Sequence, residues 1–267
     1  MIPPADYHLH TEFSPDSQEK IEIICEKAIS EGIEEIVLTD HCEFPLMERT
    51  PWPDFALRKE VIDECRDRFG SQLSIRSGVE LGQPYYDLPL MEKLMAEESF
   101  DFVIGSVHHA EARIDYKTID INEGNFRDYF DRYLANTHTL IETADFDCIG
   151  HIDYFFKYCP ADLVRSRPPE SFEKEYKELF DLAVSCGKGI EINCSGLRMP
   201  SVQNTLPSVE ILRWFRQCGG KTVTVGSDGH SRYSVFSGIS QGYDNLRAAG
   251  FSQVARFRNR EVYYVEI

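Results

Sequence analysis

Histidines and carboxylates recur in this chain where short apolar runs end. His8 and His10 flank Leu9 at the end of the first such run, and Asp228 closes the last one just before His230. The other candidates of this kind are His41, Glu80, His108 and His151. Imidazole and carboxylate donors without cysteine are ligands that Zn²⁺, Mn²⁺ and iron accept. Because one ion takes about four to six ligands, some of them water, a set of this size predicts two or three ions with one bridging carboxylate.

Each motif alone also has a simpler explanation. In a strand, His8 and His10 project to the same side, and a single histidine there is commonly a hydrogen-bonded core residue. The segment 150–153 could hold only a His–Asp hydrogen bond. Glu80 favours a cation more directly, since a buried carboxylate without a partner is costly. Structural histidines would scatter over helices and surfaces, as we expect for His138, so the collection of the others at successive run ends predicts a metal site.

The apolar runs alternate with helical patterns. The runs are typical of parallel strands buried on both faces, and they span residues 6–10, 36–41, 73–81, 102–108, 148–154, 189–194 and 222–228. A final run at 261–267 could close or edge the sheet. Helical patterns cover residues 18–30, 55–69, 123–143, 172–185, 208–218 and 240–249. This alternation predicts parallel βαβ units, and no GxGxxG or GxxxxGK[ST] motif supports a nucleotide-binding open sheet. We therefore predict an α/β barrel in a single domain over residues 1–267, with the ligands at the C-terminal ends of its strands.

The bulk properties narrow the classes of function. A formal net charge of −17 disfavours binding to nucleic acid, but a small phosphorylated substrate is compatible because bound metal ions reverse the field locally. The eight cysteines form no CxxC pair, and we expect reduced, mostly buried thiols. The first seven residues lack the features of a signal peptide, and no apolar run approaches the ~20 residues of a membrane span. We therefore expect a cytoplasmic protein that does not bind membranes, and the oligomeric state stays open.

Seven segments in this order resemble those of the polymerase and histidinol phosphatase (PHP) family, in particular its stand-alone histidinol-phosphate phosphatases. They are Tyr7-His8-Leu9-His10 with Ser14-Pro15-Asp16, Leu38-Thr39-Asp40-His41, Gly78-Val79-Glu80, Gly105-Ser106-Val107-His108, Gly150-His151-Ile152-Asp153, Glu191-Ile192-Asn193 through Gly196-Leu197-Arg198, and Gly226-Ser227-Asp228-Gly229-His230. The resemblance runs from Asp6 to His230. It implies a distorted TIM-like barrel of seven β/α units, (β/α)7, with three divalent metal ions.

The resemblance also assigns the ligands. It implies a first metal held by His8, His10, Glu80 and Asp228, a second by Glu80, His108 and His151, and a third by Asp16, His41 and His230. Some family members carry His at the position of Asp16, and this difference could change the preference among Zn, Mn and Fe. His109 follows a ligand directly on a strand, so we expect it to point away from the site.

The resemblance further implies positively charged residues at the phosphate. Arg198 fits that role, and Lys157 stands where relatives carry Arg, although a lysine offers a point charge instead of a bidentate fork. The expected chemistry is attack of a metal-bridging hydroxide on phosphorus, since metal binding lowers the pKa of water to roughly 7. Arg198 and Lys157 would offset charge in the transition state. Asp153 and His41 are candidates for the acid that protonates the leaving group.

The predicted function is hydrolysis of L-histidinol phosphate, with Glu43 and Asp115 as carboxylates that contact the positively charged part of the substrate. One alternative is another PHP phosphoesterase acting on nucleotides, DNA ends or other small phosphate esters. A second is a metal-dependent amidohydrolase, which also begins with HxH but usually supplies a bridging carboxylated Lys that is not visible here. A third is a non-catalytic metal-binding protein. The loop at 44–53, which contains Trp52, is a candidate lid.

Overall fold

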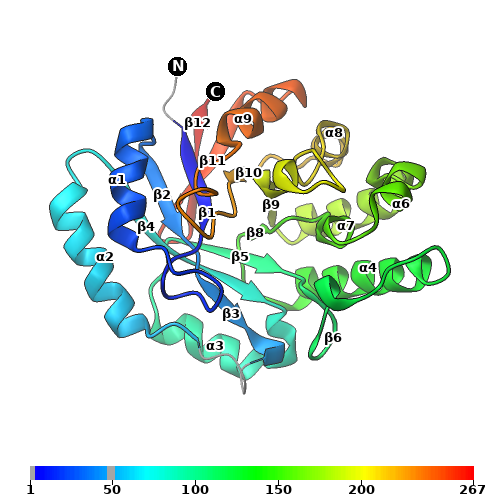
Figure 1. Ribbon diagram of the computed structural model, residues 1–267, viewed down its shortest axis with the longest axis horizontal. Coiled ribbons are helices and arrows are strands. Elements are labelled where there is room, and N and C mark those ends of the chain that lie inside the picture. The colour runs from blue at the N-terminus through cyan, green and yellow to red at the C-terminus, as the bar shows by residue number, and fades with distance from the viewer. Residues whose placement is uncertain (1–3, 47–51) are drawn as a thin grey trace.

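Parallel strands form a nearly closed ring in the computed structural model, which describes residues 4–46 and 52–267 (Figure 1). The ring runs in the order β1 (Ala5–Leu9), β2 (Glu35–Leu38), β4 (Ser74–Gly82), β5 (Phe102–Ser106), β8 (Cys148–Ile149), β9 (Gly189–Asn193) and β10 (Val223–Gly226). Each neighbouring pair on this path is parallel. The predicted distorted barrel of seven β/α units in one domain is therefore confirmed.

The ring closes where its first and last strands meet. The amide of Asp228 donates to the carbonyl of His8 at 2.9 Å, and the amide of His10 donates to the carbonyl of Gly229 at 3.0 Å. These two bonds lie at the C-terminal ends of β1 and β10. Closure therefore brings the beginning and the end of the predicted ligand set together.

Two of the predicted strands are shorter or divided. The run at 36–41 breaks after β2, and β3 (His41–Glu43) then pairs with β4 outside the ring path. The run at 148–154 keeps only two strand residues before the chain turns into helix α5. Both changes occur where the chain leaves the barrel to present a histidine.

Helices pack around the outside of the ring (Figure 1). They are α1 (Ile21–Glu31), α2 (Phe55–Phe69), α3 (Leu88–Glu97), α4 (Phe126–Thr143), α5 (Tyr154–Lys157), α6 (Ala161–Ser166), α7 (Glu173–Ser185), α8 (Val209–Gln217) and α9 (Ile239–Ala248). Short 3-10 turns are η1 (Phe44–Leu46), η2 (Pro84–Tyr86), η3 (Tyr116–Thr118), η4 (Pro169–Phe172) and η5 (Cys194–Arg198). Helix α2 begins at Asp54, whose carboxylate accepts from the Leu57 amide at 3.1 Å as an N-cap. Helices α3, α5 and α6 were not predicted.

The C-terminal hairpin fills the end of the barrel opposite the histidines. It consists of β11 (Gln253–Arg258) and β12 (Glu261–Glu266), paired antiparallel in a separate sheet. The prediction that the last run closes or edges the main sheet is therefore wrong. The Phe102 ring lies 5.3 Å from that of Tyr7 and 4.8 Å from that of Phe257, and these residues belong to a small core inside the barrel.

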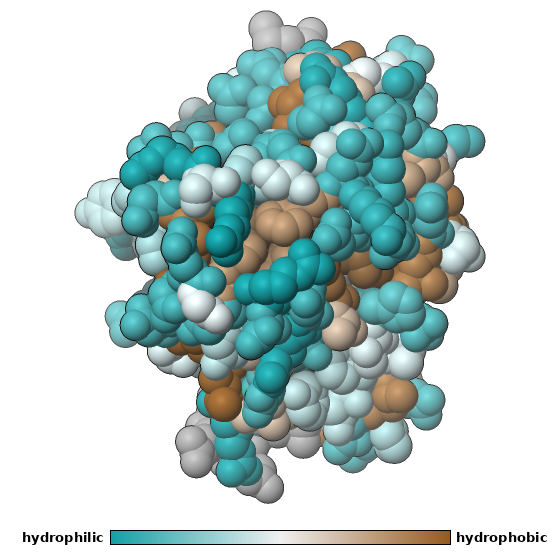
Figure 2. Space-filling model, turned by 90° about the vertical axis from the view of Figure 1, so that its right-hand side faces the viewer, coloured by the Kyte–Doolittle hydropathy of each residue, from teal (hydrophilic) through white to brown (hydrophobic). Residues whose placement is uncertain are grey.

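The surface is mostly hydrophilic, and most of the cysteines are buried free thiols, as the sequence predicted. Figure 2 shows mostly hydrophilic side chains, with hydrophobic ones in smaller areas, on the side toward which β5 points in Figure 1. All eight cysteines lie in the described part of the chain as free thiols, and all but Cys186 and Cys218 are buried. No helix in residues 4–46 and 52–267 is long and apolar enough to cross a membrane.

Candidate metal centre

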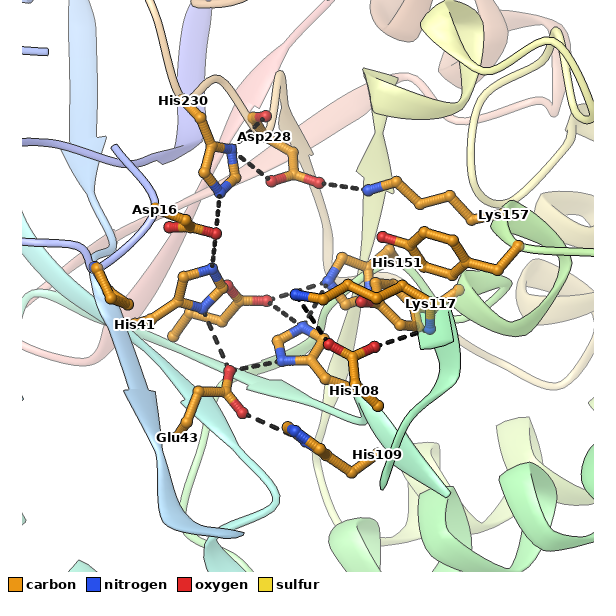
Figure 3. Close-up of a pocket in the computed structure, with 15 residues that line it drawn as sticks. Asp16, His41, Glu43, His108, His109, Lys117, His151, Lys157, Asp228 and His230 are labelled. Carbon is orange, nitrogen blue, oxygen red and sulfur yellow. Dashed lines mark hydrogen bonds and ion pairs between the residues drawn. The ribbon is translucent and has the colours of Figure 1, made fainter. Parts of the chain in front are cut away.

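A cavity of about 280 Å³ opens at the C-terminal ends of the strands (Figure 3). Seven of the nine predicted ligands line it, namely Asp16, His41, Glu80, His108, His151, Asp228 and His230. His8 and His10 lie deeper and have no exposed surface. The structure thus brings the whole predicted set to one place.

The first group of donors surrounds the end of β1. His8, His10 and Asp228 offer three ligand atoms within 4.8 Å of one another. Glu80 Oε2 lies 3.2 Å from His8 Nε2 and 3.6 Å from His10 Nε2. Asp228 Oδ1 lies 3.5 Å from the same His10 nitrogen.

The second group shares Glu80 with the first. Glu80 Oε1 lies 3.0 Å from His151 Nε2 and 3.3 Å from His108 Nε2, and the two imidazole nitrogens face each other at 3.2 Å. Glu80 therefore directs one oxygen to each group, which is the geometry that a bridging carboxylate requires.

A third group lies nearer the mouth of the cavity. Its members are His10, Asp16, His41 and His230. Asp16 Oδ2 lies 3.3 Å from His230 Nε2 and 3.6 Å from His41 Nε2. The Asp16 side chain is 52% exposed, so this group is the most open to solvent.

The donor chemistry of these groups fits divalent metal ions. His8 Nε2, His10 Nε2 and Glu80 Oε2 are buried and have no hydrogen-bond partner within the described part of the chain. Buried polar atoms of this kind are costly unless a cation or a donor satisfies them. These overlapping groups of His and carboxylate atoms, which contain no cysteine, match the preferences of Zn²⁺, Mn²⁺ or iron.

Burial and the neighbouring charges shift the pKa values of the clustered side chains in different directions. Burial opposes charge on Glu80, but the histidines around it, first His8 and His41, hold its pKa well below the usual range. Burial also acts against the His8 cation, yet Glu191, Glu80 and Asp228 raise the pKa of His8 well above its ordinary value. The pKa of His10 falls to about 3 because it is buried and lies beside His230 and His41. Metal binding requires ionised carboxylates and neutral imidazoles, so Glu80 and His10 are already in the required states, whereas a metal ion would have to displace a proton from His8.

Buried carboxylates orient the imidazoles from behind. Glu191 Oε1 lies 2.7 Å from His8 Nδ1, and Glu191 Oε2 accepts from the His151 amide at 2.9 Å. Glu43 Oε1 lies 2.6 Å from His108 Nδ1. Because an ionised carboxylate only accepts, the contacts of Glu191 with His8 and of Glu43 with His108 place a proton on Nδ1 and direct Nε2 of each ring toward the metal groups.

Glu43 lines the cavity and is in contact with imidazoles, and its role as a substrate contact stays a prediction. Its Oε1 is also 3.3 Å from His41 Nδ1, so the carboxylate is held between imidazoles. A Cβ on Gly82 would meet Glu43 Oε2 at 2.1 Å, so only glycine leaves room for this side chain. His109, expected to point away, instead lines the cavity with Nδ1 3.7 Å from Glu43 Oε2. The alternation fails because β5 ends at Ser106 and His109 begins the separate strand β6 (His109–Glu111).

The predicted phosphate-binding residues are not equivalent. Lys157 lines the cavity, and its Nζ lies 3.1 Å from Asp228 Oδ2. Arg198 donates to the carbonyls of Ser227 at 2.8 Å and Asp228 at 3.1 Å, and it is not among the described residues that line the cavity. Its guanidinium thus holds the loop that carries Asp228, and a contact with the phosphate stays a prediction.

Asp153 lies outside the cavity formed by the described residues. Its carboxylate accepts from the Tyr176 hydroxyl, and burial raises its pKa to about 7. This position does not fit an acid for the leaving group, so we do not retain that assignment. The candidate lid at 44–53 falls partly outside the described residues. The ring centroids of Phe44 and Trp52 lie 4.9 Å apart, and neither residue lines the cavity.

Asp115 does reach the cavity, and the structure adds residues that the motifs did not indicate. Asp115 ends the β7 strand (Ile114–Asp115), and its carboxylate pairs with Lys117 Nζ at 3.0 Å. Lys117, Tyr154 and Tyr158 also line the cavity. Lys117 follows Asp115 by two residues, and this spacing of opposite charges is the sequence feature that could have indicated Lys117 as a site residue.

Comparison with known proteins agrees with this geometry. A family model described as PHP domain matches residues 6–195. The chain belongs to the PHP domain family. It is 28% identical over 266 residues to a histidinol-phosphatase of Lactococcus lactis, covering 96% of this chain and 95% of that protein. It is 26% identical over 253 residues to a probable histidinol-phosphatase of Thermotoga maritima, covering 94% of each chain.

Two solved structures share the fold of this PHP protein. The histidinol phosphate phosphatase of Lactococcus lactis, in complex with zinc, L-histidinol and phosphate, aligns with a TM-score of 0.84 at 24% identity, over 97% of this chain and 98% of that one. The putative histidinol phosphatase of Listeria monocytogenes aligns with a TM-score of 0.74 at 20% identity, over 89% of this chain and 99% of that one.

Proposed function

We propose that this PHP protein is a metal-dependent phosphatase that hydrolyses L-histidinol phosphate to L-histidinol and phosphate. The observation that carries the proposal is the arrangement of three donor groups that share Glu80 and His10 at the base of one cavity. The relatives named histidinol-phosphatase extend over nearly the whole chain. A solved relative with the same fold holds zinc, L-histidinol and phosphate.

The chain's residues would hold three divalent ions. The ligands would be His8, His10, Glu80 and Asp228 for the first ion, Glu80, His108 and His151 for the second, and Asp16, His41 and His230 for the third. When bound, such ions supply Lewis acidity toward the phosphoryl oxygens and lower the pKa of water to roughly 7. Glu191 and Glu43 would keep His8 and His108 in the tautomer that presents Nε2.

The cavity wall carries charges that suit the substrate. Lys157 lies beside Asp228 at the metal groups, where a positive charge stabilises the phosphoryl oxygens in the transition state. Asp115 supplies a negative charge for the amine or imidazole of histidinol. The rings of Tyr154 and Tyr158, 5.1 Å apart, form an aromatic wall between these two charges.

The domain bounds, the partner and the cellular location are also part of the proposal. Asp228 and His230 lie beyond residue 195, where the family match ends, so we take residues 1–267 as one PHP domain. A small phosphorylated substrate, and not nucleic acid or a membrane, is the proposed partner. A cytoplasmic location remains part of the proposal, and cell fractionation would test it.

The deciding experiment measures phosphate release from L-histidinol phosphate against a panel of phosphate mono- and diesters, with metal counted on the same sample. A kcat/KM of about 10⁴ M⁻¹s⁻¹ or more for histidinol phosphate alone supports the proposal. His151→Gln should lose activity and metal, whereas His138→Gln, at an exposed pair with Glu142, should keep both. Preferred hydrolysis of a nucleotide or of single-stranded DNA would replace the substrate, and a full-length protein that binds no metal would overturn the function.

A further inference from the structure

We infer that Lys117 is a substrate-binding residue that leaves Asp115 to engage the phosphoryl group. In this exchange the Lys117–Asp115 pair selects phosphate esters that also carry a positive charge. The inference deepens the proposed function and rests on it.

The two positive side chains predicted from sequence lie at or behind the metal groups, and neither is at the mouth of the cavity. Arg198 is committed to backbone carbonyls behind Asp228. Lys157 is 12% exposed, and its Nζ lies 3.1 Å from Asp228 Oδ2. Its Nζ therefore reaches the phosphoryl oxygens from the side of the metal groups, and not from the mouth of the cavity. A phosphate monoester carries up to two negative charges, so a mobile positive group at the mouth would add to the attraction that the metal ions and Lys157 supply.

Lys117 meets that requirement. It lies in the η3 turn after β7, and Figure 3 shows its side chain extending into the cavity from the Asp115 side. Its side chain is 59% exposed and that of Asp115 is 15% exposed, so the ammonium end of this ion pair is open to solvent. Burial lowers the pKa of Lys117, but Asp115, Tyr158 and Asp16 raise it above the usual value. The ammonium therefore stays charged and lies within the electrostatic reach of a predicted metal ligand.

Asp115 is held in place independently of the Lys117 ammonium. Its Oδ1 accepts from the Lys117 backbone amide at 2.8 Å, and its carbonyl accepts from the Thr118 hydroxyl at 2.7 Å. Movement of the Lys117 side chain would therefore expose the carboxylate without displacing it. Next to it in the cavity wall is His109, whose two ring nitrogens are buried and have no hydrogen-bond partner among the described residues.

The exchange explains selectivity by charge. A substrate with a phosphate and an ammonium replaces one internal ion pair with two new ones, Lys117 to phosphate and Asp115 to ammonium. A phosphate ester of an uncharged alcohol gains only the first and leaves the Asp115 carboxylate without its partner. The site thus favours aminoalkyl phosphates over simple phosphates of similar size.

The test uses metal-loaded full-length protein with L-histidinol phosphate, phenyl phosphate and inorganic phosphate as an inhibitor. Lys117→Met should raise KM for both esters and the Ki of phosphate by roughly tenfold or more, as expected for loss of a charged hydrogen bond, and Lys117→Arg should restore most of the loss. Asp115→Asn should raise KM only for histidinol phosphate. Lys59→Met, which removes an exposed lysine paired with Asp63 on α2, is the matched control and should change neither.

Each outcome decides the role of Lys117. A Lys117→Met protein with unchanged metal content and with KM and Ki within about twofold of wild type, well below the effect of a charged contact, overturns the inference. If the wild type hydrolyses phenyl phosphate but not histidinol phosphate, the proposed substrate fails, and the phenyl phosphate KM and phosphate Ki still decide Lys117. If neither ester reacts, calorimetric binding of phosphate to the zinc-loaded protein decides it, since equal affinity in both proteins rejects the role.

Discussion

Arg58→Met should destabilise the protein more than any ordinary surface change, because Arg58 is a buried cation. Its side chain is 2% exposed. Its Nε donates to Asp40 Oδ2 at 2.6 Å, and the other guanidinium nitrogens donate to the Leu38 and Gly78 carbonyls and the Ser77 hydroxyl. Methionine keeps the apolar part of the side chain but leaves the Asp40 carboxylate buried without its cation.

The expected loss follows from the cost of breaking a buried ion pair. Removing one partner costs about 3–5 kcal/mol, so we expect the free energy of unfolding to fall by about 4 kcal/mol. This corresponds to a change of roughly 10³-fold in the ratio of folded to unfolded protein, at about 1.4 kcal/mol per tenfold. The measurement is urea unfolding at neutral pH, followed by circular dichroism in the presence of a chelator.

Arg68→Met on the same helix is the matched control. Arg68 is 55% exposed and pairs with Glu26 at 3.0 Å on the surface, so its loss should cost less than about 1 kcal/mol. The double variant Arg58→Met, Asp40→Asn should lose clearly less than the sum of the two single changes, because the two residues contact each other. Equal and small losses for Arg58→Met and Arg68→Met would refute the reasoning.

The same pair sets a dependence on pH. Burial raises the pKa of Asp40, but Arg58 and the hydrogen bonds around the carboxylate lower it below its ordinary value of 3.8 overall. A carboxylate whose folded pKa is depressed contributes stability above its unfolded pKa and loses it as the pH falls through the folded value. The difference between wild type and Arg58→Met should therefore be largest at neutral pH and shrink below about pH 4. A difference that grows on acidification would contradict this sign.

Three further changes test the centre itself. Glu191→Gln removes the carboxylate behind His8 and should weaken metal binding by about 10–100-fold, measured by competition with a chelator; unchanged affinity would reject the orienting role. Stripping metal with a chelator should lower the melting temperature, and zinc at about 1,000 times its Kd should restore about 4 kcal/mol of stability; an unchanged melting temperature would argue against bound ions. Gly82→Ala should displace Glu43, since its Cβ would lie 2.1 Å from the carboxylate, and should reduce activity, whereas Gly124→Ala, which meets only Asn122 Oδ1 at 3.3 Å, should not.

The sequence predicted the ligand set because parallel strands end on one face. Residues as distant as His8 and His230 converge for that reason alone, and no contact between them needs to be known in advance. The resemblance to the PHP family added Asp16 and implied which ligands join which group. The same logic predicted the seven-stranded ring and most of the long helices.

The roles of the second layer could not be predicted in this way. Arg198 and Lys117 are both long flexible cations in loops, and only packing decides that the first turns to carbonyls while the second enters the cavity. His109 escaped the alternation rule because the strand ended three residues earlier. The carboxylate at position 43 was expected at the substrate, but its partners come from strands that only the fold places beside it.

Ring closure by Asp228 and His10 also has a temporal consequence. A chain emerging from the ribosome presents His8 and His10 first, and Glu80, His108 and His151 follow within the next 150 residues or so. Asp228 and His230 arrive only with the last quarter of the sequence, and they close the ring as they complete two of the donor groups. A nascent or truncated chain ending near residue 200 would have the complete Glu80–His108–His151 group, but the other two groups would lack Asp228 and His230. Metal capture in the full set is therefore coupled to the completion of synthesis, and a prematurely ended product should bind fewer ions than the intact protein.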